Sequence, residues 1–448
     1  MIGRIKNLTN QAMAHSGLRK YGTNMSWLFA EKIFRMIIGF TVGVYVARQL
    51  GPTQYGILNY AISIVAIFSI VAGLGLDSIV VRELVKYPEK RNKILGSTFI
   101  LKLAGVFIML TGIGITLYFK NDDQTKNLII LVIAAGYLFQ VFQTIDFYFQ
   151  SQVLSKYVAI SQVIAWGLVS TGRVFFAWKG YPLIYFAWLE AINMCLMSLG
   201  YLFFYMIKVS HPFNWRFDLR LSESLLKNSW PLLLSGATGM IYMRIDQVMI
   251  GSMLGDTEVG YYAVAVRLSE IWYFFPIIVC SSLFPAIIRS KQISKKHYNE
   301  RIQKLYAMLL WFSFLLVFLY VFLGEWIIVI LYGKDYIKAV WVLKIYIFIS
   351  IFVFPSILRG KELIAIDKGK IIAISTFLGA FLNIIMNYFF IRHYYVVGAA
   401  IATLCSRCII FFIIPVIFKK HKILNISFFK ALVYPFKILK LLIVNRAG

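Results

Sequence analysis

Residues 305–324 read LYAMLLWFSFLLVFLYVFLG and contain no charged side chain. A helix of about 20 apolar residues is long enough to cross the ~30 Å hydrocarbon core of a bilayer. Comparable stretches recur along the whole chain. The sequence therefore predicts an all-α integral membrane protein with about twelve transmembrane helices. We expect them over residues 24–47, 54–81, 94–119, 128–149, 157–178, 182–207, 223–253, 259–288, 303–331, 338–360, 370–391 and 396–418.

The composition excludes a soluble enzyme. The chain has 448 residues, of which 60% are apolar and only 15% are charged, and its mean hydropathy is +0.76. Soluble domains are about 45–50% apolar and about 25% charged. A net charge of +27 would suggest nucleic acid in a soluble domain. Here the basic residues separate apolar runs, so we expect anionic lipid beside the loops and no nucleic-acid partner.

The basic residues alternate from loop to loop. Charges at the ends of spans are counted with the adjoining loop. The N-terminus, the even-numbered loops and the C-terminal tail then hold 31 of the 46 Lys and Arg, and the odd-numbered loops hold 7. Cytoplasmic loops are the basic ones. This bias predicts that both termini lie in the cytoplasm.

The longest predicted cytoplasmic connection divides the spans into six and six. We predict a cytoplasmic N-terminal segment, two six-helix halves joined by a cytoplasmic linker, and a basic amphipathic cytoplasmic tail. These cover residues 1–23, 24–207 and 223–418 with the linker 208–222, and 419–448. The N-terminal segment has no apolar core or cleavage site of a signal peptide.

An internal echo supports the two halves. Residues 50–56, LGPTQYG, reappear as residues 254–260, LGDTEVG, and each copy joins the first and second spans of its half. Leu-Gly followed by Gly is also common in generic turns. The matching position within each half favours a parallel internal repeat.

No soluble-enzyme, cofactor or metal motif is present in the sequence. It lacks a phosphate-binding loop, an H-E-x-x-H pair, a nucleophile elbow and a dinucleotide fingerprint. Cys405 and Cys408 form C-x-x-C within an apolar span, where thiolates are disfavoured. We expect no metal, no cofactor and no catalytic residue.

Ionisable residues within the spans are the candidate functional residues. Each costs about 2.5–3.5 kcal/mol or more at the bilayer centre, so it should face a cavity or a partner. Interhelical pairs that only fix packing are the alternative. Arg fits an anionic cargo, because its planar fork binds phosphate bidentately. The candidates are the cations Lys32, Arg35, Arg244, Arg267 and Arg407 and the acids Glu31, Asp146, Glu190, Asp246 and Glu270.

Five stretches of this sequence resemble a known family. They are residues 47–60 (ARQLGPTQYGILNY), 73–83 (GLGLDSIVVRE), 244–251 (RIDQVMIG), 378–387 (LGAFLNIIMN) and 398–403 (GAAIAT). The chain resembles the O-antigen flippases, in the polysaccharide-transporter branch of the multidrug/oligosaccharidyl-lipid/polysaccharide exporter superfamily. The resemblance implies two six-helix bundles around a central cavity. It also implies residence in the bacterial inner membrane and transfer of an undecaprenyl-diphosphate-linked oligosaccharide from the cytoplasmic to the periplasmic leaflet.

On this resemblance, the five cations are expected to bind the diphosphate and sugar. The five acids would pair with them or titrate during the cycle, with a proton or sodium as a candidate counter-ion. Other polysaccharide-assembly membrane proteins are candidate partners. The runner-up is a multidrug exporter of the same superfamily, whose cationic cargo the arginines disfavour. The lipid II flippases resemble fourteen-helix chains, and O-antigen polymerases and ligases carry one large periplasmic loop that is missing here. A purely structural subunit would not need so many charges at mid-depth.

Overall fold

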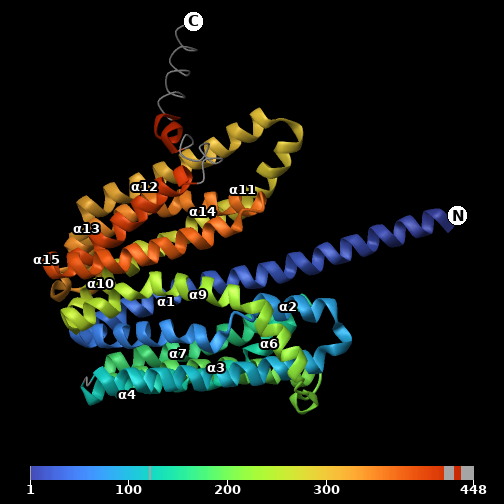
Figure 1. The fold of residues 1–448 in the computed structure, drawn as a ribbon, viewed down its shortest axis with the longest axis horizontal. Helices are drawn as coiled ribbons and strands as arrows, with labels where there is room; N and C mark the ends of the chain where they lie inside the picture. Colours follow the sequence, from blue (N-terminus) through green and yellow to red (C-terminus); the bar gives the residue numbers. More distant parts are fainter. Residues whose placement is uncertain (1, 121–122, 418–427, 435–448) are drawn as a thin grey trace, which may run out of the picture. The chain divides into compact units, whose positions relative to one another are not determined.

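The computed structural model describes residues 2–120, 123–417 and 428–434, and every regular element within these ranges is helical (Figure 1). The all-α prediction is confirmed. In the same ranges, nine segments are long and apolar enough to cross a membrane. Two of them, Phe29–Lys86 and Gly369–Ile414, are long enough for two crossings at about 1.5 Å per residue. The number of twelve spans and the cytoplasmic termini stay predictions.

The contacts divide the described chain into two compact units. Unit 1 comprises Met1–Leu50 and Ala61–Met240, and unit 2 comprises Gly51–Tyr60 and Ile241–Gly448. The division falls inside two helices, α1 (Ile2–Gly73) and α9 (Leu219–Met253), whereas the predicted linker is residues 208–222. The predicted six-helix halves stay a prediction.

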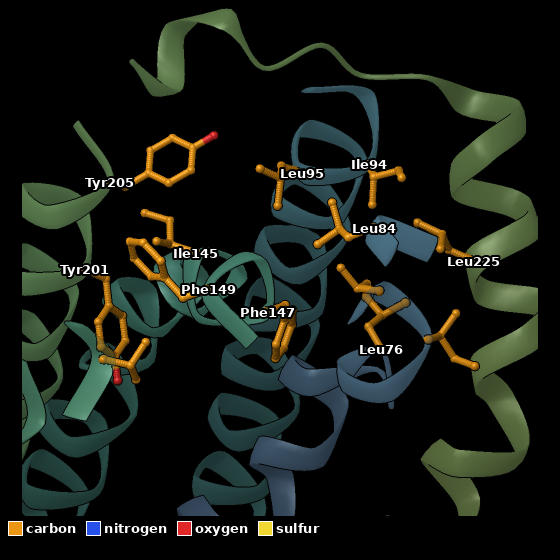
Figure 2. Packing of buried hydrophobic residues seen from close by; sticks show 13 residues of the cluster. Leu76, Leu84, Ile94, Leu95, Ile145, Phe147, Phe149, Tyr201, Tyr205 and Leu225 are labelled. Carbon is orange, nitrogen blue, oxygen red and sulfur yellow. The ribbon is translucent and has the colours of Figure 1, made fainter. Parts of the chain in front are cut away.

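Unit 1 is a bundle whose core lies among α2, α3, α6 and α8. Figure 2 shows part of this core, where Phe147 and Phe149 of α6 extend toward opposite sides. The rings of Phe149 and Tyr205 meet edge to face with centroids 6.5 Å apart. The elements that lie wholly or mainly in unit 1 are α1 (Ile2–Gly73), α2 (Asp77–Lys86), η1 (Pro88–Lys90), α3 (Arg91–Lys120), α4 (Gln124–Ala135), α5 (Tyr137–Gln140), η2 (Val141–Gln143), α6 (Thr144–Ser151), α7 (Lys156–Lys179), α8 (Leu183–Lys208), η3 (Pro212–Asn214) and the first part of α9 (Leu219–Met253).

Unit 2 packs its helices around α13, which contacts α10, α12 and α15. Tyr395 interrupts the helical conformation of α15, with φ 52° and ψ −144°. Besides Gly51–Tyr60 of α1 and the end of α9, the elements of unit 2 are α10 (Asp256–Glu270), η4 (Ile271–Tyr273), α11 (Phe274–Ile293), α12 (Lys295–Tyr332), η5 (Lys334–Tyr336), α13 (Ala339–Tyr346), η6 (Ile347–Ile349), α14 (Ser350–Ala365) and α15 (Gly369–Ile417).

The two echoed segments share a backbone conformation. Gly51 interrupts α1 with φ 71° and ψ 172°, and Gly255 precedes α10 with φ 98° and ψ 178°. Side-chain-bearing residues rarely adopt this conformation, so glycine is required at both places.

These segments also contact each other within unit 2. The hydroxyls of Thr53 and Thr257 are hydrogen-bonded at 2.8 Å. Gly56 lies against the backbone of Asp256, and Gly260 lies against the backbone of Pro52. The repeat offset of 204 residues relates Thr53 to Thr257. The same offset relates the Gly56–Asp256 contact to the Gly260–Pro52 contact. Such a two-fold arrangement is what a parallel internal repeat predicts.

The linker is tied to the end of unit 1 that carries η1. Lys93 forms an ion pair with Asp218 at 3.1 Å, and Asp218 accepts a hydrogen bond from the backbone N–H of Leu221 at the start of α9. These two interactions, the backbone one first, lower the pKa of Asp218 below its ordinary value. Most of the predicted amphipathic tail lies outside the described residues. Its residues 428–434 are helical, with Phe428 buried against Phe411.

Candidate functional site

Unit 2 contains a buried carboxylate that is held by neutral groups. Asp246 of α9 is 4% exposed. Its Oδ2 accepts hydrogen bonds from the hydroxyls of Tyr262 and Thr403, at 2.6 and 2.8 Å. Its Oδ1 accepts one from the amide of Asn387 at 2.5 Å. In the part of the chain that the structure describes, no Lys or Arg lies within ion-pair distance of this carboxylate.

Further oxygen atoms lie near Asp246 besides those that hydrogen-bond to it. Asn383 donates to Thr403 Oγ1 and accepts from Asn387, both at 3.1 Å. The Oδ1 of Asn387 is buried and has no hydrogen-bond partner. A buried carboxylate with a spare amide oxygen and a hydroxyl is the kind of oxygen set that binds a hard cation, and the carboxylate can bind a proton instead.

Two arginines of unit 2 are held by aromatic rings. Arg407 of α15 lies over the ring of Tyr242, 4.0 Å from the centroid, and its Nε is buried without a hydrogen-bond partner. Arg359 of α14 lies over Phe411 at 3.9 Å. Both arginines line one cavity of about 200 Å³, between α9, α14 and α15. Among the described residues, neither arginine has a carboxylate within ion-pair distance.

The other predicted residues of unit 2 lie nearby in α9 and α10. Arg267 donates to the hydroxyl of Tyr55 at 3.1 Å, next to the contact of the echoed segments. Glu270 accepts a hydrogen bond from Tyr346 at 3.1 Å and is attracted by Arg244 and then by Arg407. The structure thus brings Arg244, Glu270 and Arg407 into one electrostatic neighbourhood.

In unit 1 the predicted charges on α1 face each other. Arg35 Nε lies 3.2 Å from Glu31 Oε1. That oxygen accepts no well-formed hydrogen bond, so the contact is an ion pair. Glu31 is buried, Arg35 is half-buried and Lys32 is exposed.

The remaining predicted acids of unit 1 also have cationic neighbours. Glu190 of α8 forms an ion pair with Arg173 of α7 at 2.6 Å. Asp146 of α6 is attracted by Lys102 of α3. Lys102 is 3% exposed and donates to Gln143 at 2.9 Å.

Several of these partners were missed by the sequence analysis. Lys102 and Arg173 are lone cations within predicted spans, and that position alone marks a candidate. Arg359 falls at the end of a predicted span, where a cation is ordinary. Asn383 and Asn387 are spaced i, i+4 on an apolar helix, which indicates one polar face.

Comparison with known proteins gives two family matches. Residues 21–291, more than half of the chain, match the family model described as polysaccharide biosynthesis protein. Residues 231–389 match the MatE family model.

Curated relatives align with most of the chain. A protein named as a probable low-salt glycan biosynthesis flippase of Haloferax volcanii is 25% identical over 85% of this chain and 79% of its own length. A capsular polysaccharide biosynthesis protein of Staphylococcus aureus is 22% identical over 86% of this chain and 96% of its own length.

Solved structures share the fold. An inward-facing multidrug resistance MATE family transporter of the MOP superfamily superposes with a TM-score of 0.69 and 13% identity, covering 91% of this chain and 96% of that one. The lipid II flippase MurJ, in an inward closed conformation, gives a TM-score of 0.68 and 19% identity, covering 92% of this chain and 91% of that one. The fold is therefore that of multi-pass membrane transporters.

Proposed function

Because the chain belongs to the polysaccharide biosynthesis protein family, we propose that it is a flippase for a lipid-linked oligosaccharide and not an enzyme. Its cargo would be an undecaprenyl-diphosphate-linked repeat unit of O-antigen or a related surface polysaccharide. Transport would run by alternating access from the cytoplasmic to the periplasmic leaflet of the inner membrane. The names of the two relatives support a cargo in glycan or capsule synthesis. The shared fold with a lipid II flippase supports a lipid-linked one.

The position of Arg407 favours an anionic cargo over a cationic one. Its guanidinium is placed by the Tyr242 ring, and within the described residues it lacks a carboxylate at ion-pair distance. An arginine whose only role is packing would be expected to pair with an acid, since an uncompensated charge in a membrane protein is costly. A diphosphate supplies the missing charge, and Arg binds it with parallel hydrogen bonds. A cationic drug would be repelled.

We further propose that Asp246 couples transport to a cation. The carboxylate and the oxygen atoms of Asn383, Asn387 and Thr403 come from α9 and from both parts of α15. A sodium ion would use these oxygens directly, whereas a proton would neutralise Asp246. Binding of either cation would neutralise the buried negative charge of Asp246. This would alter the packing of α9 against α15.

Deletion of the gene in its host tests the function. The flippase predicts loss of surface polysaccharide and accumulation of undecaprenyl-diphosphate-linked repeat units that face the cytoplasm. The wild-type gene on a plasmid should restore the polymer.

The alternative is a multidrug exporter, which the MatE match and the MATE-like fold favour. Intact long-chain polymer together with lowered tolerance of cationic dyes after the deletion would establish the exporter and reject the flippase.

A further inference from the structure

One edge of the Arg359 guanidinium makes no well-formed hydrogen bond with a described residue, although Tyr306 and Glu362 attract the group. The side chain is 6% exposed, so water does not satisfy it. Its Nη1 donates to the backbone oxygen of Phe411 at 2.8 Å, and the ring of the same residue supports the guanidinium plane. Its Nε and Nη2 are buried and have no hydrogen-bond partner. These two atoms carry the parallel N–H donors that bind a carboxylate or phosphate bidentately.

The neighbouring acid is turned to other partners. Glu362, one turn along α14, accepts hydrogen bonds from Tyr306 at 2.7 Å and from Tyr298 at 3.4 Å. Within the described residues Glu362 is not in ion-pair contact with Arg359, although it attracts this neighbouring cation electrostatically. Burying N–H donors without hydrogen-bond acceptors is unfavourable, so the open edge of Arg359 needs an explanation.

Arg407 reaches the same cavity from the second part of α15. Its Nε is likewise buried without a partner, and the hydroxyl of Tyr242 below it is bonded to Ser406 at 3.2 Å. Ser375 and Thr376 add hydroxyl groups to the lining from the first part of α15. The cavity thus has two arginines with open donors, fixed by two aromatic rings, and no acid among its described lining residues.

We propose that this cavity, which we call the two-arginine pocket, binds a phosphate-type anion through Arg359 and Arg407. Its volume of about 200 Å³ is below the ~300–1,000 Å³ of pockets that enclose whole drug-sized ligands. It suits a phosphate or diphosphate group. If the proposed flippase function holds, on which this assignment of the occupant rests, the anion is the diphosphate of the lipid-linked oligosaccharide.

Binding to the full-length protein tests the pocket. The protein is purified in dodecyl maltoside, which contains no phosphate, and titrated with farnesyl diphosphate by microscale thermophoresis. We expect Arg359→Gln and Arg407→Gln each to weaken binding by about ten- to hundredfold, the effect of losing hydrogen bonds to a charged group. Arg359→Lys keeps the charge but loses the fork, so it should fall between wild type and Arg359→Gln.

Arg392→Gln is the matched control. Arg392 is also on α15 and also lies over an aromatic ring, Tyr388 at 4.1 Å, but it is exposed. Its substitution should leave binding unchanged. At a fixed concentration, farnesyl diphosphate should raise the Tm of wild type and Arg392→Gln by the same amount and the Tm of Arg359→Gln by less. A variant with reduced yield is assessed by this ligand-induced shift, and Arg359→Lys replaces Arg359→Gln if the latter does not fold.

The competitors identify the source of the anion. Inorganic diphosphate that binds as tightly as farnesyl diphosphate would assign the pocket to a free anion, and displacement by phosphatidylglycerol would assign it to bilayer phospholipid. Both results support the phosphate chemistry of the pocket and reject the lipid-linked diphosphate as its particular occupant. Equal affinity of wild type and Arg359→Gln would overturn the proposal. The function is tested separately, because intact polymer in the deletion strain would reject the flippase whether or not the pocket binds an anion.

Discussion

Buried charged side chains have different partners in units 1 and 2. In unit 1, Glu190 is paired with Arg173 and Glu31 with Arg35, whereas buried Lys102 is hydrogen-bonded to the neutral Gln143. In unit 2, Asp246 is bonded only by neutral side chains, and Arg407 rests on an aromatic ring. In an ion pair, each charged group offsets the charge of the other. Neutral hydrogen-bonding side chains and aromatic rings fix the position of a charged group without supplying the opposite charge. The two ion pairs of unit 1 therefore fit a packing role, whereas Asp246 and Arg407 of unit 2 fit binding of an ion and a ligand.

The largest effect is expected at Asp246. Replacing it with Asn removes the charge but keeps the size, so transport should be lost while the protein still reaches the membrane. Loss of an outer partner of a metal ligand already costs about 10–100-fold in affinity, and a direct ligand should cost at least as much. The readout is surface polysaccharide in a deletion strain that carries each variant, with membrane levels measured by immunoblot. Asp367→Asn, in the exposed turn before α15, is the control. Normal polymer from Asp246→Asn would remove the coupling role.

The next effect concerns the echoed segments. A methyl group on Gly56 would overlap the carbonyl of Asp256, and one on Gly260 would overlap the carbonyl of Pro52. Overpacking costs about 1–3 kcal/mol, and more where the obstacle is backbone that cannot turn aside. Gly56→Ala and Gly260→Ala should therefore lower the free energy of unfolding by similar amounts, because their contacts are two-fold related.

Gly167→Ala in α7 of unit 1 is the control for this pair, since nothing lies within 4 Å of the added methyl group. It should be neutral or slightly stabilising. Unfolding is followed by denaturant titration in mixed micelles. A large cost for one glycine and none for the other would show that the two repeats are not equivalent at this contact.

The ion pair of unit 1 gives a smaller effect that sharpens the contrast. The side chains of Arg173 and Glu190 are 16% and 22% exposed. Removing one partner should therefore cost about 1–3 kcal/mol, below the ~3–5 kcal/mol of a fully buried pair. The double variant Arg173→Gln/Glu190→Gln should cost less than the sum of the single ones. A cycle of Arg407→Gln with Glu270→Gln, which form no ion pair, should show weaker coupling. Equal coupling in both cycles would contradict the distinction between the units.

The sequence predicts some of this organisation and not the rest, for a physical reason. Lipid requires long apolar helices, so local hydropathy is enough to predict the all-α membrane fold. The resemblance to the family likewise rests on short contiguous stretches, so it can be recognised without knowledge of the fold. The partners of a charge come from other helices, as when Tyr262 and Thr403 meet at Asp246. Arg359 was missed because its position near a span end is ordinary, and only the structure shows that its edge is buried.

The smallest effect is expected outside the membrane, at Asp218. Here an ion pair and a helix cap share one carboxylate, and they lower its pKa from the ordinary 3.8. A carboxyl with a lowered pKa in the folded state stabilises the fold fully above its ordinary pKa, and this stabilisation is lost as pH falls through the folded-state value. Asp218→Asn should therefore have a slightly lower Tm than wild type near pH 7, and the difference should shrink below about pH 4. Added salt should reduce the difference as well, because Lys93 and Asp218 are accessible to solvent. A gap in Tm that stays constant with pH would mean that the amide caps α9 less well than the carboxylic acid for reasons other than charge. In that case the linker would resemble unit 2, where neutral hydrogen bonds position a carboxylate, more than the ion pairs of unit 1.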